Sequence, residues 1–240
     1  CAMTALPRIV CTIGMHGSAS TWVFNMAREI LTLALGVDAV LPLFADKMEH
    51  LPPEAECAGK TLIIKSHEGS AALEQWLDEH DALRLLSVRD PRDATLSLML
   101  RFGMKLLPAA NAIARDGTRL QRLAARGIPV WRYEDGFFRQ EAALDTLAAR
   151  LGCNLAPQLR AALLARYSTD SVRAFAQNIE ALPPERLTKV GNFTMDRVTQ
   201  ILSPHIGDAG SGKFRALPET LQPQLTSFFL PLLTQFGYPP

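Results

Sequence analysis

Short apolar runs alternate with longer amphipathic stretches along the first half of this chain. The runs at 9–13, 61–65 and 83–88 are rich in isoleucine, leucine and valine, and a shorter run follows at 129–133. Such runs are typical of strands buried on both faces of a sheet. Between them, apolar residues recur every three or four positions, the spacing of an amphipathic helix. Strands that alternate with helices predict an α/β fold with a central parallel sheet flanked by helices.

Helical periodicity and capping signals predict where the helices lie. Asp90 is a suitable N-cap and Pro91 suits the first helical position that follows it. Residues 36–60 contain three prolines and no sustained period, so we predict a long connection with one helical turn. The C-terminal half is predicted to be helix-rich. The predicted helices span 20–35, 71–80, 91–105, 108–126, 137–151, 157–179, 194–202 and 218–236.

Composition and charge exclude several classes of protein. The 240 residues suffice for one domain with a sizeable core, and we assign 1–240 to it. The net charge of +1 gives no overall field that would attract nucleic acid. No apolar run approaches the roughly 20 residues of a membrane-spanning helix. The four cysteines are scattered without metal-ligand spacing, so we expect free thiols in a cytoplasmic protein and no bound metal.

Polar residues follow three of the predicted strands at the point where each apolar run stops. These segments are Gly14–Ser20, Lys65–Glu68 and Arg89–Pro91. In a parallel α/β sheet, ligands bind beyond the carboxyl ends of the strands. The first segment joins a strand to a helix through small residues, so its N–H groups and the helix dipole favour an anion such as a phosphate. The sequence therefore predicts a P-loop-like domain with its site at this edge.

The first loop departs from the Walker motif of ATP-binding proteins, GxxxxGK[ST]. Counted from Gly14, Ala19 stands where glycine is required and Ser20 stands where the phosphate-binding lysine is required. A small-molecule kinase that uses Mg²⁺ and ATP is therefore disfavoured.

Five segments, in order, resemble motifs of the cytosolic-type sulfotransferases, a family that transfers a sulfuryl group from 3′-phosphoadenosine 5′-phosphosulfate (PAPS). HGSASTW at 16–22 resembles the phosphosulfate loop PKSGTTW, and KSH at 65–67 matches the family's K[ST]H. RDPRDATLS at 89–97 matches the 3′-phosphate motif RNPKDVAVS, and RYED at 132–135 resembles RYEDL. GDAGSGK at 207–213 keeps the spacing of the late RKGxxGDWK element. The resemblance leads us to expect a bacterial member of this family.

The resemblance implies a role for each matching residue. His67 would take the proton from an acceptor hydroxyl, and Lys65 would neutralise charge on the sulfuryl oxygens. Arg89 and Ser97 would hold the 3′-phosphate, and Trp22 would stack on the adenine. No metal is implied, and 3′-phosphoadenosine 5′-phosphate (PAP) would be the product. The other nucleotide-binding candidates are His16, Gly17, Ser18, Ala19, Ser20, Thr21, Tyr133, Gly210 and Lys213.

Three departures from the family pattern favour a second hypothesis, a protein that holds PAP or PAPS without turnover. Gly17 stands where the family carries Lys or Arg, and His16 next to it is a candidate substitute. His205-Ile206 replaces an Arg-Lys pair, and Gly212 replaces a tryptophan. The family's dimer motif KxxxTVxxxE is absent, so the sequence assigns no oligomeric state.

The acceptor is predicted only as a class, a small-molecule, carbohydrate or lipid compound with a hydroxyl or amine group. The family places its acceptor against residues that correspond to 36–60 and 104–126, which carry no recognisable signature here.

Simpler roles for the same residues stay open at this point. His67 could cap the next helix, and Arg89 could be a surface residue paired with Asp93. Glu134 and Asp135 could orient a neighbour rather than act as an acid–base pair. A stripe of arginines on one predicted helix face favours a solvated surface, with an anionic acceptor or membrane surface as the alternative. The stripe comprises Arg115, Arg119, Arg122 and Arg126.

Overall fold

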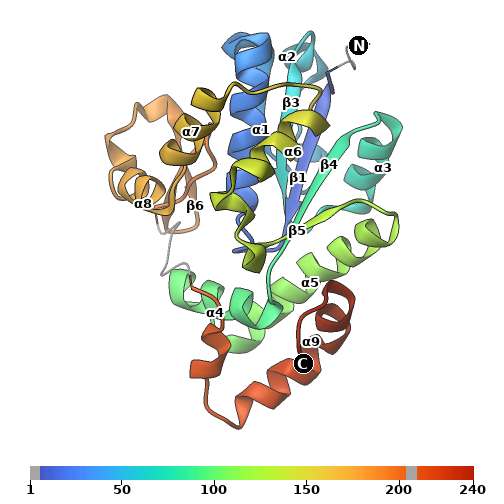
Figure 1. Cartoon of the computed structure of the whole chain (residues 1–240), viewed down its shortest axis with the longest axis vertical. Helices are drawn as coiled ribbons and strands as arrows, with labels where there is room; N and C mark the ends of the chain where they lie inside the picture. Colours follow the sequence, from blue (N-terminus) through green and yellow to red (C-terminus); the bar gives the residue numbers. More distant parts are fainter. Residues whose placement is uncertain (1–5, 204–209) are drawn as a thin grey trace.

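A five-stranded parallel sheet forms the centre of the molecule in the computed structural model, which describes residues 6–203 and 210–240 (Figure 1). The strands lie in the order β2-β3-β1-β4-β5. They are β1 (Ile9–Gly14), β2 (Val40–Phe44), β3 (Thr61–Ser66), β4 (Leu83–Val88) and β5 (Val130–Arg132). Because β3, β1 and β4 are neighbours, the three polar segments predicted from the sequence emerge side by side at one edge of the sheet. The predicted α/β fold is confirmed.

Helices cover both faces of the sheet, as Figure 1 shows. The core on one face contains residues of α1, α6, α7 and α8, and the core on the other face contains residues of α3, α4, α5 and α9, the last of which packs on α4 and α5. The alternation of β1 explains the division, because Ile9, Cys11 and Ile13 enter one core while Val10 enters the other. The helices are α1 (Ser20–Leu35), α2 (Glu54–Cys57), α3 (Ala71–Glu79), α4 (Pro91–Phe102), α5 (Leu106–Ala125), α6 (Glu141–Arg150), α7 (Pro157–Arg166), α8 (Thr169–Gln177) and α9 (Leu221–Phe236).

Three predictions of secondary structure are wrong. The connection predicted over 36–60 contains β2, an edge strand that tolerates Pro42. The helix predicted over 157–179 is divided between α7 and α8, where Ser168 caps α8 by accepting from the Ser171 N–H. In place of the helix predicted over 194–202, the chain forms β7 (Phe193–Asp196), which pairs antiparallel with β6 (Leu187–Val190), and then a turn that brings Leu202 beside Met195.

The described cysteines are free thiols, as predicted: Cys11, Cys57 and Cys153. Burial raises the pKa of the Cys11 thiol to about 12. Among the described residues, no helix is both long and apolar enough to cross a membrane. The predictions made for Cys1, for His205-Ile206 and for Gly207 concern residues outside the described ranges.

Candidate active site

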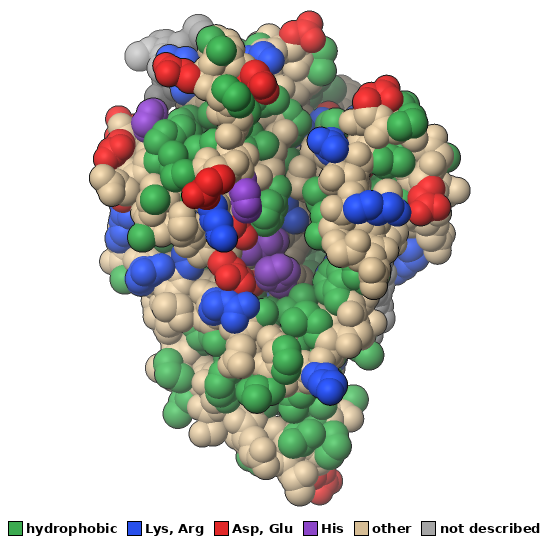
Figure 2. Space-filling model, turned by 180° about the vertical axis from the view of Figure 1, so that it is seen from behind, with side chains coloured by type: hydrophobic (Ala, Val, Ile, Leu, Met, Phe, Trp, Pro, Cys, Tyr) green, Lys and Arg blue, Asp and Glu red, His purple; other side chains and the backbone are tan. Residues whose placement is uncertain are grey.

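A cavity of about 480 Å³ lies at the carboxyl ends of the central strands. From the face opposite that of Figure 1, histidine side chains are seen in a hollow at the middle of the molecule, beside acidic and basic groups (Figure 2). Twelve of the residues predicted from the sequence line this cavity: His16, Gly17, Ala19, Ser20, Thr21, Trp22, Lys65, His67, Arg89, Ser97, Tyr133 and Lys213. Ser18 and Gly210 do not line it.

The loop between β1 and α1 forms one end of the cavity. A Cβ added at Gly14 would lie 2.6 Å from the Ser87 hydroxyl and 2.9 Å from the Ser18 hydroxyl, so glycine is required there. Ala19, just before α1, has φ 61°, a left-handed conformation that is strained for a residue with a side chain. Its methyl group cannot cap the first turn, so the N–H groups and the dipole of α1 are offered to an anion.

Ser18, which the sequence predicts to bind the nucleotide, does not line the cavity and supports the loop from within. Its side chain is fully buried, and its Oγ lies 2.8 Å from the Ser87 Oγ. Its backbone N–H donates to the carbonyl of Met15. The Ser18 hydroxyl therefore holds the loop against β4, and its N–H closes the turn within the loop.

His67 follows β3 and is held on three sides. Its backbone N–H donates to Asp46 Oδ1 at 2.7 Å, and its carbonyl accepts from the Arg119 guanidinium at 3.0 Å. Its ring Nδ1 lies 2.6 Å from the Gly14 carbonyl oxygen. A carbonyl only accepts, so Nδ1 carries the hydrogen and the neutral ring keeps its lone pair on Nε2. Burial, aided by neighbouring His16 and Lys65, holds the pKa of His67 well below its usual 6.5.

His67 does not cap the next helix, because Ser70 does so by accepting from the Leu73 N–H. With Nδ1 used as a donor and the charged form disfavoured, Nε2 of His67 is suited to accept a proton in the cavity.

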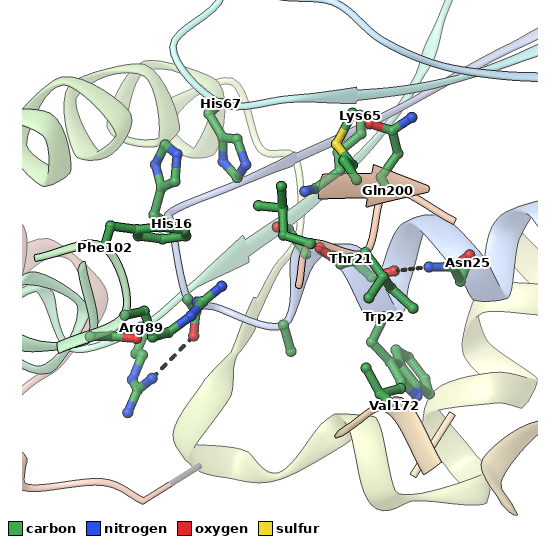
Figure 3. A pocket seen from close by; sticks show the side chains of 18 of the residues that line it. His16, Thr21, Trp22, Asn25, Lys65, His67, Arg89, Phe102, Val172 and Gln200 are labelled. Atoms are coloured by element: carbon green, nitrogen blue, oxygen red, sulfur yellow. Dashed lines mark hydrogen bonds between the residues drawn. The ribbon is translucent and has the colours of Figure 1, made fainter. Parts of the chain in front are cut away.

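His16 stacks on His67 with ring centroids 3.8 Å apart and the planes 17° apart. Figure 3 shows the two rings side by side. Both the backbone N–H and the Nδ1 of His16 bond to one oxygen of Asp116, at 2.8 and 2.6 Å. Asp116 lies on α5 and is fully buried. A carboxylate on a distant helix therefore fixes the position of the loop and the orientation of the ring.

Lys65, the second-last residue of β3, lines the cavity, and Arg101 lines it from the end of α4. Burial and the nearby charge of Arg101 lower the pKa of Lys65 from 10.5 to about 8. Burial and the charge of Arg89 lower the pKa of Arg101 to about 10. Sequence reasoning missed Arg101, although it follows Ser97 by four positions and so shares its helix face.

Arg89 and Ser97 lie against the loop between β1 and α1 at Gly17. Arg89 Nη1 donates to the Gly17 carbonyl at 3.2 Å, and a Cβ added at Gly17 would lie 3.4 Å from the Ser97 Oγ. The Arg89 guanidinium also lies 4.2 Å from the ring centre of Tyr133 and donates to the Gly210 carbonyl. These contacts bring the β1–α1 loop, α4 and the segment at Gly210 together around the Arg89 guanidinium.

Arg89 is a buried residue, not a surface one, although Asp93 is a loose partner at 3.9 Å. Asp93 instead holds the late loop, because its carboxylate accepts from the N–H of Gly212 at 2.5 Å and of Phe214 at 3.0 Å. Lys213 stands between these two anchored residues and lines the cavity. Glu134 orients its neighbours, accepting from the Asp90 N–H and from the Tyr238 hydroxyl.

The predicted solvated stripe of arginines is wrong at its centre. Arg119 is 1% exposed, pairs with Glu74 and donates to the Ser66 hydroxyl at 2.6 Å. Arg115 pairs with Glu68, which follows β3, and Arg126 pairs with Asp78 on α3. Arg115 and Arg119 therefore fix α5 to the segment that carries His67, and Arg126 fixes it to α3.

The remaining lining of the cavity is largely apolar and comes from segments that the sequence did not single out. Of the range 36–60, Phe44 alone lines the cavity, and no residue of 104–126 does. The apolar lining comes mostly from the β6–β7 hairpin and the residues just after it, with one residue each from α4 and α8: Phe102, Val172, Val190, Phe193, Met195, Ile201 and Leu202.

One cluster of described side chains could hold a metal ion: His16, His67 and Asp116 have ligand atoms within 4.8 Å of one another. The Nδ1 atoms of both rings are already hydrogen-bonded. Each ring therefore has only Nε2 left as a possible ligand atom.

Comparison with solved structures identifies the fold. A retinol dehydratase in complex with retinol and PAP aligns with a TM-score of 0.62 and 12% identity, over 96% of this chain and 82% of that one. The same enzyme with androsterone and the inactive cofactor PAP gives 0.60 and 15%, over 96% and 82%. A mouse sulfotransferase, SULT7A1, complexed with PAP gives 0.64 and 11%, over 93% and 83%.

The chain therefore has the α/β fold of these PAP-bound proteins. No protein-family model matches the sequence, and no curated protein is significantly similar to it.

Proposed function

We propose that this protein is a sulfotransferase that moves a sulfuryl group from PAPS to a hydroxyl or amine acceptor, with His67 as general base. The observation that carries the proposal is the neutral His67 ring, whose Nδ1–H donates to Gly14 while Nε2 is left for a proton. This ring stands in the same cavity as Arg89, Ser97 and the uncapped start of α1. The fold shared with PAP-bound proteins gives independent support.

The cavity residues fit a nucleotide with phosphates on both sides of its ribose. The first turn of α1 and the hydroxyls of Ser20 and Thr21 would hold the 5′-phosphosulfate. Arg89 and Ser97 would hold the 3′-phosphate by charge and hydrogen bond together. The space for this phosphate is open because residue 17 is glycine. A side chain at this position would begin to fill it.

Trp22 would border the adenine, although less of its ring is available than the sequence suggested. Its side chain is 7% exposed and meets Phe137 edge-on at 5.7 Å. Its Nε1 has no hydrogen-bond partner among the described residues, which leaves a buried donor beside the cavity.

PAPS supplies the sulfuryl group, whose bond to the 5′-phosphate is the one that breaks. Nε2 of His67 accepts the proton of the acceptor hydroxyl as that oxygen attacks, because the neutral ring is the stable form at physiological pH. Lys65, from the adjacent strand end, stabilises negative charge on the oxygens of the transferred group. Asp46 and Arg119 keep His67 in place through its backbone.

The acceptor proposed here is a small molecule with an apolar body. Side chains such as Phe102, Phe193 and Met195 line the cavity on the side away from the sheet. An apolar lining with a few polar groups favours an apolar alcohol or phenol over a carbohydrate. The retinol and androsterone bound by the structural relatives agree with this class.

The experiment is a turnover assay with PAPS and a panel of apolar alcohols, phenols and amines, read out as PAP release and sulfated product by mass spectrometry. Product that disappears in His67→Gln supports the proposal. Tight PAP binding without product for any acceptor would favour the second hypothesis, a protein that holds PAP or PAPS without turnover, which Gly17 motivates. Product that persists in His67→Gln would contradict the role of His67.

A further inference from the structure

We propose that Arg101, in the last turn of α4, is a second catalytic cation, which binds the 5′-phosphosulfate and stabilises the charge left on the 5′-phosphate. Gly17 provides no charge in the β1–α1 loop, so this cation comes from α4 instead. The inference rests on the proposed function, because it names a further residue for the same reaction.

The first argument is the position of Arg101 on α4. Ser97 and Arg101 are four residues apart, so they lie on one face of the helix, and both line the cavity. Asp93, one turn earlier on this face, accepts from the N–H of Gly212. A Cβ added at Gly17 would lie 3.4 Å from the Ser97 Oγ. The missing side chain of Gly17 therefore leaves space beside the helix face that carries Arg101.

The second argument is the place of Arg101 among the other cations. Lys65 and Arg89 lie on different sides of the cavity, as Figure 3 shows. Burial and then the charge of Arg101 lower the pKa of Lys65, whereas burial and then the charge of Arg89 lower the pKa of Arg101. Such effects require short distances in a site with little water. Because Lys65 is assigned to the sulfuryl oxygens and Arg89 to the 3′-phosphate, the 5′-phosphate is the group between them.

The third argument is the contact that the guanidinium makes with Phe102. The guanidinium lies 4.8 Å from the centre of the Phe102 ring, a favourable cation–π contact. Phe102 in turn meets Phe193 edge-on at 5.3 Å, and both rings belong to the apolar lining. Arg101 therefore lies where the apolar part of the cavity meets the charged part, which is where an acceptor hydroxyl would reach the phosphosulfate.

The fourth argument is the balance of charge. The described lining of the cavity includes no Asp or Glu but four cationic side chains: Lys65, Arg89, Arg101 and Lys213. PAPS carries about four negative charges, nearly two of them on the 3′-phosphate. Burial lowers the pKa of Arg101 only to about 10, so the group is charged at neutral pH, and the negative end of the α4 dipole favours that charge. A guanidinium only donates, so its partner must be an acceptor or an anion.

The reaction balances with Arg101 in this role. The acceptor oxygen forms a bond to sulfur as the bond from sulfur to the 5′-phosphate oxygen breaks. The proton of the acceptor passes to Nε2 of His67 and then to solvent. The electron pair of the broken bond stays on the phosphate oxygen, whose negative charge is met by N–H donors of Arg101. The guanidinium keeps all its protons throughout.

The binding test is calorimetric titration with PAPS, without any acceptor, and with adenosine 3′-phosphate, which lacks the 5′ groups. Arg101→Met removes the charge and keeps an unbranched side chain. We expect it to weaken PAPS by about 10- to 100-fold, the size of a hydrogen bond to a charged group, and to leave adenosine 3′-phosphate unchanged. Arg101→Lys keeps a charge and should lose less. Arg122→Met, which changes an exposed arginine of α5, is the matched control and should alter neither affinity.

Kinetics add a readout that a purely structural role would not move. Arg101→Met should lower kcat by about 10²–10³-fold, the usual cost of removing one donor to a developing anion. The basic limb of kcat/KM should also move above pH 8, because loss of the neighbouring positive charge raises the pKa of Lys65. Arg101→Lys should leave this limb in place. Asp46 and His67, the other titratable groups that affect or are affected by Lys65, are the same in both variants.

Unchanged PAPS affinity in Arg101→Met, equal weakening of both ligands, or an unmoved basic limb would overturn the role of Arg101. A loss confined to the KM of anionic acceptors would also overturn it, because Arg101 would then bind the acceptor. Absence of PAPS and PAP binding by the wild-type protein would overturn the proposed function itself, so the two failures are distinguishable.

Discussion

The Nδ1 nitrogen of His67 lies 2.6 Å from the carbonyl oxygen of Gly14, the last residue of β1. This contact joins two neighbouring strand ends and fixes the tautomer of the ring. Gly14 itself tolerates no side chain, because an added Cβ would clash with the side chains of Ser18, Ser20 and Ser87. The proton-accepting atom of the proposed base is therefore set by the sheet itself.

Loss of the His67 ring should reduce catalysis and spare binding. We expect His67→Ala to lower turnover by roughly 10²–10⁴-fold, the usual contribution of a general base. PAP affinity should stay nearly unchanged, because the ring acts on the acceptor. Steady-state kinetics and calorimetry check this together, and equal losses of turnover and affinity would argue against the role.

The pH profile of kcat/KM should have an acidic limb at unusually low pH and a basic limb near pH 8. Activity requires neutral His67, whose pKa is well below 6.5, so the acidic limb should lie well below pH 6.5. It also requires charged Lys65, whose pKa is about 8, so activity should fall as the pH rises through 8. Lys65→Arg keeps the charge and should retain more of its activity above pH 8. An acidic limb at pH 6.5, or identical profiles, would count against these assignments.

Arg89 should distinguish nucleotides by their 3′-phosphate. We expect Arg89→Ala to weaken PAP by about 10- to 100-fold and adenosine 5′-phosphate much less, because a charge-assisted contact to the 3′ group is lost. Arg122→Ala, which changes an exposed arginine of α5, is the matched control and should alter neither affinity. Equal weakening of both nucleotides by Arg89→Ala would mean that it holds the loops and does not recognise the 3′ group.

Two arginines of one helix face should differ in their effect on stability. Arg119→Ala should lower the free energy of unfolding by about 3–5 kcal/mol, because the buried guanidinium pairs with Glu74 and donates to the Ser66 hydroxyl and the His67 carbonyl. Arg115→Ala removes an exposed pair with Glu68 and should cost less than about 1 kcal/mol. Chemical denaturation measures both, and similar losses would refute the contrast.

The sheet and the position of the site could be predicted from the sequence because polar residues end three apolar runs. Other elements could not be. Pro42 argues against a strand, yet β2 lies at the sheet edge, where a missing N–H is tolerated. The hairpin strand β7 buries Thr194 and Asp196 while Phe193 and Met195 line the cavity, so its pattern is the reverse of an ordinary half-buried strand.

Contacts between residues far apart in the chain could not be predicted from the sequence either. Asp116 stands 100 positions from His16 and falls between helical neighbours that gave no sign of its burial. The arginine stripe predicted a helix face exposed to solvent, whereas Arg119 is buried and pairs with Glu74 on α3. In both cases the partner becomes apparent only once the helices are placed against the sheet.

The measurement that tests the central claim most directly is calorimetric titration of the wild-type protein with PAP and with adenosine diphosphate. Both ligands are adenosine with two phosphates, but PAP carries the second phosphate at the 3′ position, where Arg89 and Ser97 are proposed to hold it, and adenosine diphosphate carries both at the 5′ position. We predict that PAP binds at least about 10-fold more tightly, as a charge-assisted contact requires. Equal affinity for the two nucleotides, or no binding of PAP, would contradict the account.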